Sequence, residues 1–195
     1  MPRALTEQEK CRQCERLLDK GKEIILAQGI RKVSVDDITK AAGMAKGSFY
    51  LHFDSKEQFL YKLIESVHQH LFVQAEQMIA GMDDMKTNFR SFLNNCFQMP
   101  ELVFLMKNER DIETALASLP DQELHIFKLA ETEVFERFLT MANIDTHRVK
   151  PGVVHNYVHT LYLMIGSDLM DKNDLPETIE RLTDGLIAYI FGSAQ

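Results

Sequence analysis

The stretch between residues 34 and 53, SVDDITKAAGMAKGSFYLHF, constrains the fold more than any other part of the sequence. Ser34 is a good N-cap residue, and Asp37 stands three residues later, where the acidic partner of a capping box belongs. Gly43 can take the positive φ that ends a helix of about two turns, and a second short helix can begin within two residues. The stretch therefore predicts helix, tight glycine turn, helix.

The rest of the chain has helical rather than strand periodicity. Its five prolines and nine glycines lie mostly between periodic segments, and no clear alternating pattern occurs. We expect a first helix with Thr6 as N-cap that ends at Gly29, and a long helix capped by Ser55 with Gln58 completing its capping box. Further helices are expected over residues 84–98, 100–117, 121–142, 149–170 and 175–192. The predicted fold class is all-α, with about nine helices.

Composition limits the class of protein. The chain has 195 residues, 45% of them hydrophobic, which is enough for a sizeable core. There is no run of about 18 apolar residues, so no membrane-spanning helix or membrane partner is expected, and the N-terminus lacks the apolar region of a secretory signal. The three cysteines, Cys11, Cys14 and Cys96, are few and odd in number. This favours a reduced, cytoplasmic protein.

Charge is unevenly distributed along the chain. The net charge is −7, which by itself argues against a nucleic-acid partner. Residues 1–60, however, hold 11 basic and 9 acidic side chains, a balance of +2, whereas residues 61–195 hold 11 and 20, a balance of −9. A mildly basic N-terminal part, here called the head (residues 1–60), is compatible with contact to phosphates, although the remaining chain, the body (residues 61–195), is acidic. Random scatter of charge would also explain so small an excess.

The residues that follow the glycine turn suit contact with DNA. In a helix-turn-helix, the N-terminal residues of the second helix enter the major groove. Lys46 can donate to guanine O6 and N7, and Ser48 can contact a base or a phosphate. Tyr50 and His52 can donate to phosphate oxygens. Lys56 adds a cation beside a helix N-terminus, which is itself an anion site.

These features together resemble the N-terminal domain of the tetracycline-repressor (TetR) family of bacterial transcription regulators. The resemblance runs from about residue 26 to residue 64. It rests on the glycine after the first helix, the Ser-Val-x-x-Ile opening, the Ala-Gly-Met turn, the Lys-Gly-Ser-Phe-Tyr-x-His-Phe segment and the Ser-Lys-Glu helix start. Carried over by position, it implies DNA contacts from Ser34, Val35, Ala45, Lys46, Gly47, Ser48, Tyr50, Leu51, His52 and Lys56.

The resemblance also implies the organisation of the whole chain. We expect a helix-turn-helix DNA-binding domain over residues 1–54, and a ligand-binding and dimerisation domain over residues 55–195, connected by the helix that begins at 55. Two single positions stay open. Leu51 either contacts a thymine methyl group or packs within the protein. His52 either contacts DNA or bridges helices of the head.

The body is rich in methionine and aromatic side chains, which suit an adaptable apolar pocket for a small-molecule effector. The same residues at helical spacing also fit a plain core. A buried polar group among them needs a partner, which is either a ligand or another part of the protein. The candidate pocket residues are Phe89, Phe92, Phe104, Asn108, Glu109, Phe127, Asn156, Tyr157 and His159.

The last two predicted helices are apolar over more than one face, which is more than one core stripe needs. By resemblance, these two helices from each subunit form the interface of a homodimer, and a symmetric dimer would read a palindromic operator. The candidate interface residues are Val154, Val158, Leu161, Tyr162, Ile165, Ile179, Leu182, Leu186, Ile187 and Ile190.

Other classes of protein have weaker support. Cys11 and Cys14 lack the second ligand pair of a zinc site, so we expect no metal site and no cofactor, although His155 and His159 could share a helix face. We find no phosphate-binding loop, dinucleotide fingerprint or serine elbow and expect no enzyme. The sequence thus predicts a transcriptional repressor released from its operator by a small apolar or amphipathic ligand. The alternatives are a ligand-independent dimeric DNA-binding protein and a helical enzyme with a relic helix-turn-helix.

Overall fold

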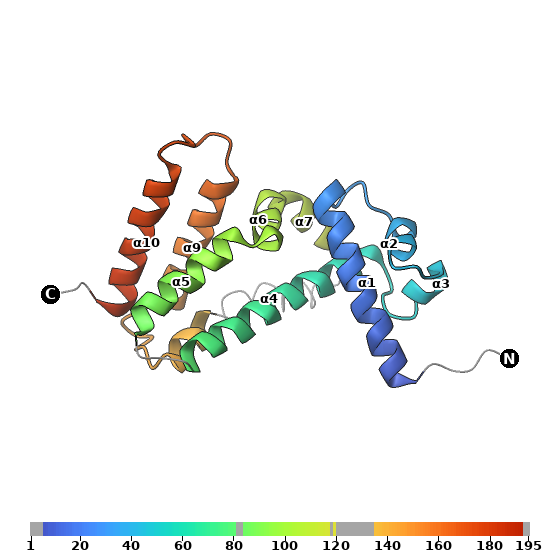
Figure 1. Ribbon diagram of the computed structural model, residues 1–195, viewed down its shortest axis with the longest axis horizontal. Helices are drawn as coiled ribbons and strands as arrows, with labels where there is room; N and C mark the ends of the chain where they lie inside the picture. Colours follow the sequence, from blue (N-terminus) through green and yellow to red (C-terminus); the bar gives the residue numbers. More distant parts are fainter. Residues whose placement is uncertain (1–5, 81–83, 118, 120–134, 193–195) are drawn as a thin grey trace. The chain divides into compact units, whose positions relative to one another are not determined.

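A computed structural model describes residues 6–80, 84–117, 119 and 135–192. Their regular structure is entirely helical, which confirms the all-α prediction (Figure 1). The helices are α1 (Glu7–Gln28), α2 (Val35–Ala41), α3 (Lys46–Phe49), α4 (Lys56–Ala80), α5 (Met85–Gln98), α6 (Pro100–Lys107), α7 (Glu109–Leu116), α9 (Pro151–Gly166) and α10 (Leu175–Phe191). Residues 135–141 are helical as well. Among the described helices, none is both long and apolar enough to cross a membrane.

The chain divides into two compact units. The first consists of Met1–Ser66 and Arg110–Pro120, and the second of Val67–Glu109 and Asp121–Gln195. This division differs from the expected boundary after residue 54, because part of α4 and most of α7 belong to the first unit. Within that unit, Arg31 before α2 forms an ion pair with Asp111 of α7, with a distance of 2.6 Å between Nη2 and Oδ1. A segment distant in sequence therefore completes the N-terminal unit.

Side-chain caps fix the starts of α1 and α2 as the sequence predicts. Thr6 caps α1 in a full capping box with Glu9. Ser34 caps α2: its Oγ accepts the Asp37 N–H at 3.2 Å, while the Asp37 carboxylate accepts the Ser34 N–H at 2.9 Å. Gly43 has a φ of 64°, so the chain can turn sharply between α2 and α3.

The predicted capping box before α4 forms only in part. The Ser55 hydroxyl accepts the Gln58 N–H at 3.1 Å, as expected. The Gln58 side chain instead accepts the N–H of Asp54, at 2.6 Å, and not that of Ser55.

An aromatic cluster forms the centre of the first unit. The rings of Phe49, Phe53 and Phe59 are at most 2% exposed, and their centroids lie between 5.0 and 5.7 Å apart. The Phe59 ring packs directly on the backbone of α1 at Gly21, where a Cβ atom would lie 2.3 Å from its Cζ. This contact needs a residue without a side chain.

In the second unit, α9 packs against α6 and α10, and α5 packs against α6 and α10. Figure 1 shows α9 and α10 side by side. Their inward faces join α5 and residues 135–141 in one core. Its most buried members include Phe89, Leu93, Leu139, Val154, Leu186, Ile187 and Ile190.

The segment 100–117, expected as one helix, is two helices separated at Asn108. The backbone of Asn108 departs from helical geometry, with φ −113° and ψ 19°, and its side-chain amide donates to the Phe104 carbonyl at 2.8 Å. An asparagine side chain competes with the backbone for such carbonyls, which favours a helix end. The helix expected over 149–170 is shorter, ending at Gly166, and of the helix expected over 121–142 only the part from residue 135 lies within the described residues.

Candidate functional site

The segment after the glycine turn exposes polar and apolar side chains over a closed core. Phe49 is fully buried, whereas Tyr50 and Leu51 are 51% and 68% exposed. Ala45, Lys46 and Gly47 are exposed too. The buried Phe49 thus holds the segment in place, and the exposed side chains around it leave one surface accessible to a partner.

All ten residues expected to contact DNA lie at the surface or partly exposed. Ser34, Ala45, Lys46, Gly47, Tyr50 and Leu51 are exposed, and Val35, Ser48, His52 and Lys56 are half-buried. The exposure of Leu51 removes support for its packing role within the chain. It is compatible with a contact to a thymine methyl group. The DNA contacts themselves stay a prediction.

Two of the expected basic contacts already have protein partners. Lys46 Nζ lies 2.9 Å from Asp36 Oδ1 in an exposed ion pair, and this carboxylate raises the pKa of Lys46. Lys56 Nζ donates to the carbonyl oxygen of Ile30 at 2.6 Å, which ties the start of α4 to the loop before α2. A DNA phosphate or base would therefore compete with an acceptor in the protein for each ammonium group.

His52 bridges two helices of the first unit. Its Nε2 lies 3.3 Å from Oε1 of Gln13 on α1. Partial burial, with a smaller contribution from Lys10, lowers the pKa of His52, so the ring is neutral near pH 7. This is the bridging role that the sequence left open, and a phosphate contact by the same ring is a separate prediction.

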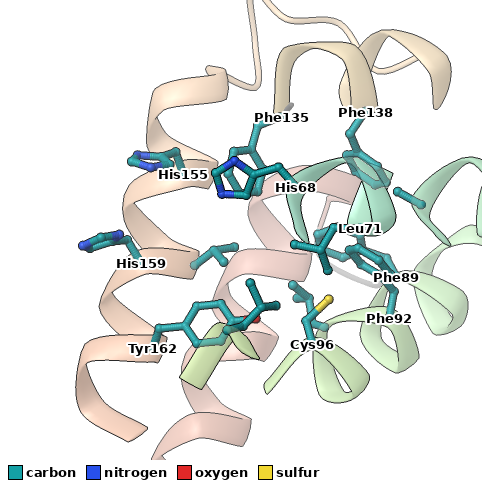
Figure 2. A pocket seen from close by; sticks show the side chains of 14 residues that line it. His68, Leu71, Phe89, Phe92, Cys96, Phe135, Phe138, His155, His159 and Tyr162 are labelled. Carbon is teal, nitrogen blue, oxygen red and sulfur yellow. The ribbon is translucent and has the colours of Figure 1, made fainter. Parts of the chain in front are cut away.

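The second unit contains an apolar cavity of about 120 Å³ (Figure 2). Two helices supply most of its wall through faces with helical spacing. The lining residues are Phe89, Phe92, Leu93 and Cys96 of α5, His155, Val158, His159 and Tyr162 of α9, and also His68, Leu71, Ala75, Leu102, Phe135 and Phe138.

Three of the nine candidate pocket residues line this cavity: Phe89, Phe92 and His159. Four others lie outside its lining: Phe104, Asn108, the exposed Asn156 and Tyr157. Phe127 and the side chain of Glu109 lie outside the described residues. The sequence held a signal for four of the missed residues. Counting four and seven positions from Phe89 leads to Leu93 and Cys96, and counting four back and three forward from His159 leads to His155 and Tyr162.

Several expected interface residues are buried within a single chain. Val154, Leu161, Leu186 and Ile190 have no exposed surface, and Ile187 is 1% exposed, because α9 and α10 pack into their own core. Val158 and Tyr162 line the cavity. Ile165, Ile179 and Leu182 remain half-buried at the surface of the two helices.

Tyr162 has the most unusual polar group of the cavity wall. Among the described residues, its buried hydroxyl has no hydrogen-bond partner. The thiol of Cys96 is its polar neighbour, but a thiol is a weak hydrogen-bond partner and leaves the hydroxyl without a hydrogen bond of ordinary distance and angle. Burial raises the pKa of both groups, that of Cys96 to about 12, so both are neutral at pH 7.

The rings of His155 and His159 lie 5.6 Å apart, measured between centroids. Within the described part of the chain, no three histidine, cysteine, aspartate or glutamate side chains gather to hold a metal ion.

The sequence is similar to known regulators in its N-terminal part. The family model described as "Bacterial regulatory proteins, tetR family" matches residues 17–62. The chain is 32% identical over 87 residues to the uncharacterized HTH-type transcriptional regulator YvdT of Bacillus subtilis, covering 45% of each chain. It is 29% identical over 82 residues to the HTH-type transcriptional repressor KstR2 of Rhodococcus jostii, covering 42% of this chain and 40% of KstR2. The chain thus spans less than half the length of these relatives.

The fold as a whole matches a solved structure. The fatty acid degradation regulator FadR from Bacillus halodurans superimposes with a TM-score of 0.65 and 19% identity, covering 89% of this chain and 97% of FadR. The relatives named here are transcriptional regulators and not enzymes. The helix-turn-helix geometry and the family match cover the same stretch, so residues 17–62 are similar to the tetR family of bacterial regulatory proteins, and the chain as a whole shares its all-helical fold with FadR.

Proposed function

We propose that this protein is a cytoplasmic, homodimeric transcriptional repressor that binds a palindromic operator and leaves it when a small molecule binds the second unit. The observation that carries the proposal is the exposed segment Ala45–Leu51, held on the buried aromatic cluster by Phe49. A recognition segment must be both rigid and accessible. The name of KstR2, a transcriptional repressor, favours repression.

The contacts divide into two roles. Lys46 and Leu51 lie on the most exposed part of the segment and read base edges, while the exposed Tyr50 donates to a phosphate. Ser34 and Lys56 lie at the starts of α2 and α4, where backbone N–H groups attract phosphates. Because Lys46 pairs with Asp36 in the free protein, binding to guanine must replace that ion pair.

The effector binds the apolar cavity of the second unit. It acts by population shift, since a ligand moves an equilibrium only by its difference in affinity for the two states. The dimer forms through the outward faces of α9 and α10, where Ile165, Ile179 and Leu182 remain partly exposed. The fully buried residues of these helices support the interface from behind.

The test is selection of binding sites from random duplex DNA with the full chain at a stated salt concentration. We expect enrichment of one palindrome with half-sites about one helical turn apart. Sedimentation at micromolar concentration should give a dimer, and the Lys46→Ala variant should lose preference at one position of each half-site. Failure to enrich any sequence, or enrichment by a monomer, would refute the proposal.

A further inference from the structure

The cavity of the second unit has one polar group whose bonding is incomplete. Tyr162 is 5% exposed, and within the described residues its hydroxyl is one of two buried side-chain polar atoms without a partner, the other being Thr183 Oγ1. Native proteins rarely leave such groups unpaired, because a buried donor without an acceptor loses the hydrogen bond it had with water. Tyr162 differs from Thr183 because it lines a cavity that can admit a molecule.

We propose that the cavity binds a small uncharged molecule, of one ring or a short branched chain, whose oxygen atom hydrogen-bonds to the hydroxyl of Tyr162. This inference rests on the proposed function, since it names the chemical class of the effector. The ligand is mostly apolar, and its oxygen lies at the end of the cavity shared by Tyr162 and Cys96.

The size of the ligand follows from the volume of the cavity. It measures about 120 Å³, slightly less than the roughly 150 Å³ apolar cavity that is known to admit benzene. A single six-membered ring with one substituent oxygen fills such a space. Phe89 and Phe138, whose ring centroids lie 5.0 Å apart, form part of the aromatic wall against which this ring would pack.

The lining determines the charge. None of its described residues is lysine, arginine, aspartate or glutamate, but three are histidines: His68, His155 and His159. Moving an ion into an apolar cavity without a paired charge is costly, so an ammonium group is selected against, and a carboxylate is selected against wherever these histidines are neutral. Cys96 and Tyr162 stay neutral because burial raises the pKa of each. A neutral oxygen, by contrast, satisfies the Tyr162 hydroxyl and leaves no charge unpaired.

The structure also fixes the position of the Tyr162 ring. Figure 2 shows the Tyr162 ring extending from α9 toward Cys96. The Phe97 ring holds it from the edge, with 5.1 Å between centroids and an interplanar angle of 75°. The hydroxyl is therefore placed before the ligand arrives, which lowers the entropy lost on binding.

The test measures binding of three probes of similar size to the full chain by titration calorimetry: phenol, toluene and benzoate. In the natural protein, phenol should bind about two- to tenfold more tightly than toluene, the effect of one hydrogen bond between neutral groups. At about pH 8.5, above the ordinary histidine pKa of about 6.5, benzoate should bind at least about tenfold more weakly than phenol, because its charge then has no partner in the described lining.

Two variants that each lose one hydroxyl group assign the effect to its residue. In Tyr162→Phe the preference for phenol over toluene should disappear, while toluene binds as before. Tyr157→Phe is the matched control, since Tyr157 lies on the same helix but not in the lining. It should keep the preference. Thermal unfolding of both variants establishes that they are folded.

Three results would overturn the inference: a phenol preference that survives Tyr162→Phe, benzoate binding as tight as that of phenol, or no binding of phenol to the natural protein. DNA-site selection on the same preparation separates this inference from the proposed function. Tyrosine-dependent phenol binding without any enriched DNA sequence would support the cavity assignment and refute the repressor. An enriched palindrome without phenol binding would support the repressor and refute the cavity assignment.

Discussion

The same substitution, glycine to alanine, at two positions of the first unit separates an effect on stability from an effect on DNA binding. Gly21 is buried in α1, and a Cβ added there would lie 2.3 Å from Phe59 Cζ and 3.3 Å from Ile38 Cγ2. Gly47 lies exposed in α3, and a Cβ there would have no neighbour within 4 Å. Glycine to alanine should therefore be harmful to folding at the first position and harmless at the second.

The magnitude at Gly21 is a balance of two effects. Alanine favours the helix by about 0.5–1 kcal/mol relative to glycine, whereas overpacking a filled core costs about 1–3 kcal/mol. Phe59 cannot simply rotate away, because it has no exposed surface and packs against both Phe49 and Phe53. Gly21→Ala should destabilise the protein by about 1–2 kcal/mol, which lowers Tm by roughly 2–8 °C in a chain of this size.

Gly47→Ala should have the opposite profile. Alanine leaves the unfolded chain less conformational freedom than glycine does, which stabilises the folded state by about 0.5–1 kcal/mol. Tm should therefore stay the same or rise slightly. The added methyl group stands on the surface that we assign to DNA, and affinity for the selected operator should fall at least about tenfold. Circular dichroism on heating and fluorescence anisotropy with labelled operator measure the two effects. A Gly21→Ala protein with raised Tm, or a Gly47→Ala protein with unchanged DNA affinity, would refute this reasoning.

Four further variants and one chemical probe test other parts of the structure. Lys46→Ala should weaken binding to the operator by about ten- to a hundredfold and relax preference at one base position, measured by repeating the site selection. Lys56→Ala should lower the affinity for all DNA sequences alike and reduce the slope of log affinity against log salt concentration by about one. It should also lower Tm, since the Lys56 ammonium group donates to the carbonyl of Ile30 in the loop before α2. Without ligand, Tyr162→Phe should raise Tm by roughly 2–4 °C, because it removes an unpaired buried hydroxyl, and a clear fall in Tm would mean that the hydroxyl has a partner. Burial raises the pKa of Cys96 from 9.0 to about 12, so iodoacetamide at pH 8 should alkylate it at least about tenfold more slowly than the exposed Cys11, as read by mass spectrometry. Because the unfolded thiol ionises first, the same shift predicts that stability falls as pH rises above 9.0 toward 12, which thermal unfolding across that range would measure for natural protein against Cys96→Ala.

The N-terminal unit could be predicted closely because its signals are local. Ser34, Asp37 and Gly43 each act within a few residues of their own position, so their roles follow from spacing alone. The partner of Lys46 could not be found in this way. Asp36 lies ten residues before it, and only the turn at Gly43 brings the two side chains together.

The second unit was harder to predict because its apolar residues have several equivalent uses. Leu161, Leu186 and Ile190 suit a core, a pocket or a dimer interface equally well in sequence, and the fold assigns them to the core. Tyr162 was expected at an interface and lies in the cavity wall. The choice depends on how α5, α9 and α10 pack, which is a long-range property that helical periodicity does not contain.

The discontinuous first unit has a consequence for the order of events during protein synthesis. A head made only of residues 1–66 could complete its contacts soon after it leaves the ribosome. Here the unit also includes Arg110–Pro120, and Asp111 is the partner of Arg31. At about 5–20 residues per second, the ribosome needs roughly 3–11 s more to make the intervening chain. The nascent first unit therefore waits for its last helix and completes its contacts only after more than a third of the second unit has been made.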